Sequence, residues 1–214
     1  LSAGHLDGRF LKPVYEGDLV TVRSRLGAEA GGQRVELEVA NEAGGICAVG
    51  AGWLLQAAER DVDLERFVEA EVFAGRPDAS PGVFEANPRL GSIEEVFHGG
   101  EKYEALLAEL GDDLPLWREA RAPAHPGYLI RFANSVLTAN VRLGPWMHVE
   151  SNAAFFREAH RGEHLATRAN VLAVFEKKGH RFVELEVLTL ASGDEPVMLT
   201  RHVAIYEPRR VRLD

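Results

Sequence analysis

The sequence predicts an α+β fold in which antiparallel strands surround a buried helix, and it predicts this arrangement twice. Apolar residues recur at helical spacing over residues 129–143 with few charges between them, which predicts a buried helix over residues 126–143. Residues 34–41 alternate apolar and polar side chains, as a half-buried antiparallel strand does. The pentapeptide Val-Glu-Leu-Glu-Val occurs at residues 35–39 and again at residues 183–187, which indicates an internal duplication.

The start of the predicted helix has the features of a ligand site. Pro126 suits the first helical position, which makes His125 the N-cap. The backbone N–H groups of Gly127 and Tyr128 are then expected to be unpaired donors at the positive end of the helix dipole. Such an end can hold an anion or a polarised carbonyl. At the other end, Gly144 and Pro145 stop the helix, and residues 146–151 resume as a strand.

The residues before residue 56 predict a small antiparallel meander. Residues 9–26 are expected to form two short extended pieces joined at Gly17-Asp18. The strand at residues 34–41 continues through a Gly44-Gly45 turn into residues 46–55. No long apolar helix accompanies these strands, so the first copy of the duplication is expected to be incomplete at its N-terminus. The sequence begins at Leu1 rather than at methionine, which leaves a further N-terminal portion open.

The remaining residues complete the predicted organisation. Residues 59–71 are highly charged and favour a helix, and residues 92–110 predict a second one with Ser92 as its N-cap. Three further strands are expected at residues 165–175, 181–191 and 197–206. The predicted division is a partial N-terminal repeat at residues 1–58, a connector at residues 59–91 and a second repeat at residues 92–214, which contains the central helix.

Composition excludes several classes of protein. No run approaches 18 apolar residues, so no membrane-spanning helix is expected, and no signal-peptide pattern begins the sequence. The net charge of −9 argues against a nucleic-acid partner. Cys47 is the single cysteine, which excludes an internal disulfide and favours a cytoplasmic location. His160 and His164 are separated by a glycine and no HExxH motif occurs, so no metal site is expected.

Two segments give the chain its resemblance to a known family. The segment RFLKPVYEGDLVTV from residue 9 and the segment DDLPLWREARAPAHPG from residue 112 resemble the MaoC-type hydratases and dehydratases, which have the hotdog fold. The likeness covers most of the chain except the connector. It implies a double hotdog fold that binds an acyl thioester of coenzyme A or a carrier protein. It also implies that the acyl carbonyl lies at the helix N-terminus, and that no cofactor is needed beyond the coenzyme A of the substrate.

The resemblance is incomplete where the chemistry lies. The active hydratases have an Asp-x-Asn-Pro-x-His run whose Asp and His activate water. Here Asp112 and Pro115 match that run, but Leu114 replaces the Asn and Trp117 replaces the His. Hydration requires both a base and an acid within hydrogen-bond reach of the substrate, and tryptophan cannot transfer a proton. His125 is the expected substitute, with His148 next.

Each of these residues also has a structural interpretation. His125 is equally consistent with a capping role, and Asp112 with local turn chemistry. Four residues are expected to line the pocket: Trp117, Asn134, Trp146 and His148. Three basic residues near a predicted turn are expected to contact the phosphates of coenzyme A, although a hairpin tip is often simply solvated: Lys177, Lys178 and Arg181.

Three functions remain open from the sequence. The first is an enoyl-thioester hydratase or 3-hydroxyacyl-thioester dehydratase in which Asp112 and His125 form the catalytic pair, with the amides of Gly127 and Tyr128 as the oxyanion site. The second is a non-catalytic subunit that binds thioesters or has a structural role. The third is a hotdog thioesterase, ranked last because residues 128–143 contain no Asp or Glu. A homodimer or a hetero-assembly is expected, because exposed sheet edges usually need a neighbour.

Overall fold

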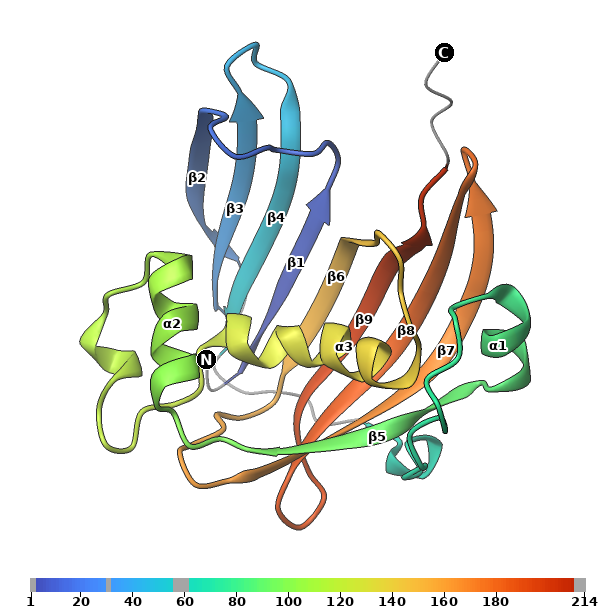
Figure 1. The fold of residues 1–214 in the computed structure, drawn as a ribbon. Coiled ribbons are helices and arrows are strands. Elements are labelled where there is room, and N and C mark those ends of the chain that lie inside the picture. Colours follow the sequence, from blue (N-terminus) through green and yellow to red (C-terminus); the bar gives the residue numbers. More distant parts are fainter. Residues whose placement is uncertain (1–2, 30–31, 56–61, 210–214) are drawn as a thin grey trace.

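One continuous antiparallel sheet dominates the fold (Figure 1). The structure is a computed structural model that describes residues 3–29, 32–55 and 62–209. Within these residues nine strands follow the order β2-β3-β4-β1-β6-β9-β8-β7-β5. The strands are β1 (Gly4–Phe10), β2 (Val20–Glu29), β3 (Gly32–Asn41), β4 (Ile46–Leu55), β5 (Arg89–Val96), β6 (Met147–Phe155), β7 (His164–Lys177), β8 (His180–Ala191) and β9 (Glu195–Glu207).

The sheet consists of two matching halves. Strands β2-β3-β4-β1 form one half and β7-β8-β9-β6 form the other, with the β1–β6 pair at the centre and β5 added at the edge beside β7. The strand register places six residues directly opposite one another in successive strands: Leu37, Gly50, Gly8, Ser151, His202 and Leu185. The central leucines of the two identical pentapeptides therefore occupy equivalent places in the two halves, which supports the predicted duplication.

Helix α3 (Pro126–Asn140) lies across the second half of the sheet, with its sheet contacts on β5, β7, β8 and β9 (Figure 1). Its spacing of apolar residues gives one wide apolar face, which is why it is buried. The first turns belong to a core cluster that also contains residues of β6, with Leu129, Phe132 and Phe155 among its members. The later turns pack over β8 through Ala133 and Leu137. The predicted central helix is thus confirmed, and it forms the core of the second half.

The helix ends three residues earlier than the sequence predicted. Asn140 is its last residue, and Val141 already has an extended backbone. The side chain of Asn140 donates from Nδ2 to the carbonyl oxygens of Val136 and Gly91, both at 2.8 Å. It also accepts at Oδ1 from the N–H of Gly91 at 2.7 Å. A polar side chain that ties the last turn to β5 cannot be recognised from the helical pattern of apolar residues.

Several predictions for the residues before α3 were wrong. The first strand is β1, which begins earlier than the expected extended piece at residues 9–26. Of the helix expected over residues 59–71, residues 59–61 lie outside the described residues, and residues 62–71 contain only the 3₁₀ turn Leu64–Arg66. A short helix, α1 (Pro81–Ala86), lies within the predicted connector.

The second predicted helix, at residues 92–110, is instead a strand followed by a helix. Residues 89–96 form β5, and helix α2 spans Glu101–Leu110. Gly99 and Gly100 separate them, both with positive φ angles of 69° and 84°, a conformation that favours glycine. Ser92 is therefore no N-cap, and its Oγ accepts from the N–H of Ala70 at 3.2 Å. The pairing of β5 with β7 outweighed the local helical pattern.

The division of the chain into two repeats and a connector stays a prediction, although β5 begins at Arg89, inside the predicted connector. Among the described residues, no helix is both long enough and apolar enough to cross a membrane.

Candidate functional site

The N-terminal end of α3 is capped by the ring of His125. The backbone N–H of Gly127 donates to His125 Nδ1 at 2.9 Å, and the N–H of Tyr128 donates to the carbonyl oxygen of His125 at 2.9 Å. His125 is therefore the predicted N-cap. The sequence predicted that the N–H groups of Gly127 and Tyr128 are unpaired donors, and this prediction is wrong because each has a hydrogen-bond acceptor within the chain. Because both N–H groups have partners inside the chain, a ligand carbonyl must displace one of them to bind here.

Asp112 lies beside this cap, just after α2. Its Oδ1 accepts from the N–H of Leu114 at 3.0 Å, and its Oδ2 accepts from Trp117 Nε1 at 2.9 Å. The Nε2 atom of His125 is 3.3 Å from the same Oδ2 atom. The hydrogen bond from the Leu114 amide, with the donors Trp117 and His125, lowers the pKa of Asp112 below its usual value. The structure thus brings together Asp112, Trp117 and His125, three residues that the sequence singled out.

The hydrogen bonds determine the protonation pattern of His125. Because Nδ1 accepts from Gly127, the proton of the neutral ring belongs on Nε2, which faces Asp112. Burial lowers the pKa of His125, and the neighbouring Asp112 carboxylate opposes this shift only in part. The ring of Trp117 packs edge-on against the imidazole, with ring centroids 4.8 Å apart. His125 is therefore a neutral donor to Asp112, held in place by an aromatic neighbour.

Tyr103 connects this pair to a cavity. The backbone N–H of His125 donates to the Tyr103 hydroxyl at 3.0 Å. The Tyr103 ring belongs to an aromatic cluster with Phe97 and Tyr128, in which ring centroids are 4.9 to 5.4 Å apart. Tyr103 and Tyr128 of this cluster also line a cavity, so Tyr103 contacts both His125 and the cavity.

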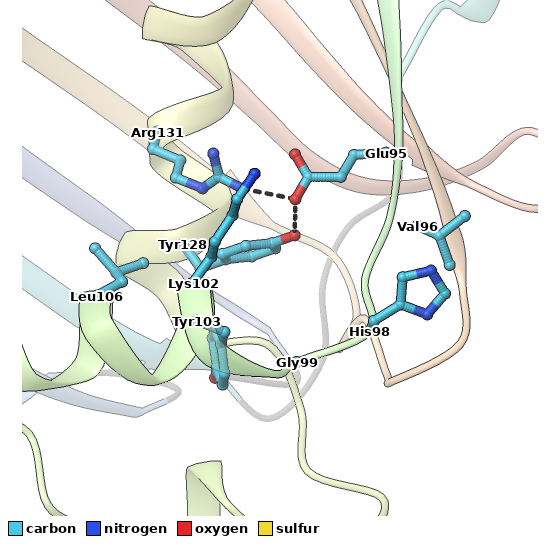
Figure 2. Close-up of a pocket in the computed structure, with 9 residues that line it drawn as sticks. All are labelled: Glu95, Val96, His98, Gly99, Lys102, Tyr103, Leu106, Tyr128 and Arg131. Atoms are coloured by element: carbon cyan, nitrogen blue, oxygen red, sulfur yellow. Dashed lines mark hydrogen bonds and ion pairs between the residues drawn. The ribbon is translucent and has the colours of Figure 1, made fainter.

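The cavity lies between β5, α2 and the start of α3 and has a volume of about 610 Å³ (Figure 2). Glu95 accepts from the Tyr128 hydroxyl at 2.5 Å and from Arg131 at 2.7 Å. Burial raises the pKa of Tyr128, and the carboxylate of Glu95 raises it further, so the phenol remains a donor at neutral pH. The cavity is lined by Glu95, Val96, His98, Gly99, Lys102, Tyr103, Leu106, Tyr128 and Arg131.

Most of these lining residues were missed by the sequence analysis, which considered Tyr128 only for its amide. The spacing of Tyr128 and Arg131 on one helix face was the available signal, because residues three apart on a helix are neighbours. Glu95 gave no such signal, since its strand was predicted to be a helix.

Other predicted pocket residues lie elsewhere. Trp146 packs against the second core cluster, away from Asp112. His148 lies seven residues along β6 from Phe155, which packs with the start of α3; this is roughly 23 Å of extended strand. The Oδ1 atom of Asn134 is buried and has no hydrogen-bond partner among the described residues. The structure does not bring these three residues together with the Asp112–His125 pair.

The predicted phosphate contacts are also distant from the pair. Lys177 and Lys178 lie at the β7–β8 turn, where Lys178 has a positive φ of 53°, and Arg181 forms an ion pair with Glu207 at 2.9 Å. The other end of β7, at His164, pairs with the end of β5 that leads to α2. The 14 residues of β7 span roughly 45 Å when extended. The basic turn therefore lies at the end of β7 that is far from α2 and from the start of α3 (Figure 1).

Comparison with solved structures places this geometry in context. A conserved hypothetical protein from Mycobacterium tuberculosis that has a double hotdog fold matches 96% of this chain and 74% of its own, with a TM-score of 0.59 and 17% identity. The chain has a double hotdog fold.

Two further structural neighbours differ in the chemistry ascribed to them. A MaoC-like dehydratase matches 96% of this chain and 75% of its own, with a TM-score of 0.60 and 12% identity. A provisionally assigned oleoyl thioesterase from Lactobacillus plantarum matches 97% of this chain and 76% of its own, also with a TM-score of 0.60 and 12% identity. No family model matches the sequence, and no functionally curated protein matches it. These likenesses establish the shared fold, and the activity must be argued from the site.

Proposed function

We propose that this protein binds acyl thioesters and that its reaction is the hydration of an enoyl thioester, or the reverse dehydration of a 3-hydroxyacyl thioester. The observation that supports this proposal is the Asp112 carboxylate, 3.3 Å from the ring of His125 at the start of the central helix. A carboxylate and an imidazole in contact can accept a proton and return it to a substrate. The expected substrate is an acyl chain on coenzyme A or on a carrier protein, and no further cofactor is required.

The chain's own residues account for the proton movements of this reaction. Asp112 accepts a proton from water as the water oxygen bonds to carbon 3 of the enoyl group. The same carboxyl group then returns the proton to carbon 2, so the proton balance closes on one residue. His125 transfers no proton in this scheme, which differs from the role expected from the sequence; its Nε2–H holds the carboxylate in place. When the thioester carbonyl replaces His125 Nδ1 as the acceptor for the Gly127 N–H, the developing enolate oxygen is stabilised by that amide.

A second candidate function is thioester binding without turnover. Asp112 accepts hydrogen bonds from Leu114 and Trp117 and contacts His125, and its lowered pKa makes it a weak base. Trp117 stands where the hydratases have a histidine and has no proton to exchange at neutral pH. These observations favour a pocket that retains the fold but has lost catalysis. A thioesterase is less well supported, because α3 contains no Asp or Glu.

The expected assembly is a homodimer or a hetero-assembly in the cytoplasm, without nucleic-acid or membrane partners. The buried free Cys47 is consistent with a reducing compartment.

The test is hydration of crotonyl-CoA, followed by loss of the enoyl absorbance, together with a titration of coenzyme A binding. We expect Asp112→Asn to lower kcat at least about 100-fold, because the base is lost. His125→Gln is expected to lower kcat with less effect on KM. The matched control is Asp113→Asn, which removes an exposed neighbouring carboxylate and should leave turnover unchanged. Binding without turnover in the wild type would refute hydration of this substrate and favour the second candidate.

A further inference from the structure

The cavity beside the start of α3 is a site separate from the Asp112–His125 pair. Its lining comes from β5, the loop after β5, α2 and α3 (Figure 2), and Asp112 and His125 are not part of that lining. Tyr103 lies between the two places, because its ring lines the cavity and its hydroxyl accepts from the His125 N–H. A volume of about 610 Å³ is typical of pockets that hold small organic molecules. The reaction proposed for Asp112 gives this cavity no role.

The lining of the cavity has a surplus of positive charge. Glu95, Lys102 and Arg131 are its carboxylate, ammonium and guanidinium groups. Arg131 and Glu95 neutralise each other in an ion pair at 2.7 Å. The ammonium group of Lys102 has no ion pair or hydrogen bond with any residue that the structure describes. One positive charge is therefore left without a partner here, in a chain whose net charge is −9.

Arg131 is held in place with donors to spare. Its Nη2 donates to Glu95 Oε1 at 2.7 Å, and the same oxygen accepts from the Tyr128 hydroxyl at 2.5 Å. The guanidinium also lies over the Tyr128 ring, 4.4 Å from the ring centroid. A guanidinium has five N–H donors in a planar fork that matches the two oxygens of a carboxylate. Because the bond to Glu95 uses one of these donors, Arg131 can donate to a ligand and keep its ion pair.

Lys102 and the apolar lining complete an amphipathic cavity. Figure 2 shows the side chain of Lys102 directed from the first turn of α2 toward the Glu95–Arg131 pair. Leu106 lies one helical turn after Lys102 on the same side of α2, and both line the cavity. The rings of Tyr103 and Tyr128 form further apolar surface. The cavity therefore has one charged end and an apolar remainder.

We propose that this cavity binds a small monocarboxylate with an apolar body, held by Lys102 and Arg131 and packed against the rings of Tyr103 and Tyr128. A single negative charge balances the one positive charge that the lining leaves without a partner. A phosphate monoester carries a charge near −2 at neutral pH and would leave an excess of negative charge. This inference rests on the cavity alone and is independent of the reaction proposed for Asp112.

The probe is 4-phenylbutyrate, titrated into the protein by isothermal titration calorimetry beside its neutral analogue 4-phenylbutanamide. We expect saturable binding of the carboxylate at one site, and binding of the amide at least tenfold weaker, because the amide lacks the charge that pairs with Lys102. Lys102→Met should weaken binding of the carboxylate at least tenfold and leave binding of the amide unchanged. The matched control is Lys12→Met, which removes the same charge from an exposed side chain after β1 and should bind both compounds like the wild type.

Four results would overturn the proposal. The first is the lack of saturable binding of 4-phenylbutyrate, and the second is binding of the amide as tight as that of the carboxylate. The third is a loss of carboxylate binding in Lys102→Met no larger than that in Lys12→Met. The fourth is tighter binding of phenyl phosphate than of 4-phenylbutyrate, since the ligand would then be a dianion. Both lysines are exposed, so the two substitutions are tolerable for the fold, which circular dichroism verifies. None of these measurements depends on the hydration assay.

Discussion

Asn140 is a buried polar side chain whose removal should destabilise the fold strongly. It is 0% exposed and joins the end of α3 to two other segments. Its Nδ2 donates to the Gly91 carbonyl at 2.8 Å, and its Oδ1 accepts from the N–H groups of Gly91 at 2.7 Å and Phe73 at 3.3 Å. Asn140→Ala removes these three bonds and leaves their backbone partners without replacements.

The size of the effect follows from those bonds. A hydrogen bond contributes about 1 kcal/mol net, and a buried group left without a partner costs more, so the three together are worth about 3–4 kcal/mol. For a chain of this size, that corresponds to a decrease in Tm of roughly 10 °C. The free energy of unfolding is measured by urea denaturation followed by circular dichroism.

The control for this prediction is Asn134→Ala, in the same helix. The Oδ1 atom of Asn134 has no hydrogen-bond partner among the described residues, so the same substitution there should change the free energy of unfolding by less than about 1 kcal/mol. If Asn140→Ala also lost less than about 1 kcal/mol, the bridging role of Asn140 would be refuted.

Two further predictions concern stability. Burial and, to a smaller extent, the stacked His148 together lower the pKa of His202 to about 3. Below pH ~6.5 the unfolded chain therefore binds a proton at His202 while the folded chain does not. The free energy of unfolding then falls as the pH decreases from ~6.5 toward 3, and His202 accounts for a loss of about 2 kcal/mol at pH 5. Urea denaturation at pH 7.5 and pH 5 should show this loss in the wild type and a smaller one in His202→Gln; equal losses would contradict it. Gly91→Ala should lower Tm by several degrees, because its Cβ would lie 2.2 Å from Val72 Cα, whereas Gly82→Ala, with nothing within 4 Å, should not. Equal melting temperatures for these two variants would show that the chain near Val72 yields easily.

The sequence indicated which residues of the candidate site lie together where they are close along the chain, and it missed those that are distant along the chain. The His125 cap and its neighbour Asp112 lie within fourteen positions of each other, next to helix ends that glycine and proline mark. Glu95 contacts Tyr128 from a strand 33 positions away, and the register of β5 on β7 brings it there. His148 was expected in the same pocket, but the direction of β6 carries it away from the start of α3.

The same distinction applies to the fold. The sequence alone determined the central helix, the strands of the second half and the repeated pentapeptide, because 3.6-residue and two-residue apolar periods are properties of neighbouring residues. The tertiary structure alone decided that residues 89–96 are a strand, since their hydrogen bonds lie on β7. It also decided that Leu185 is buried while Leu37 is exposed. Identical residues differ there because burial depends on what packs over a strand, and that is a property of the assembled sheet and helix.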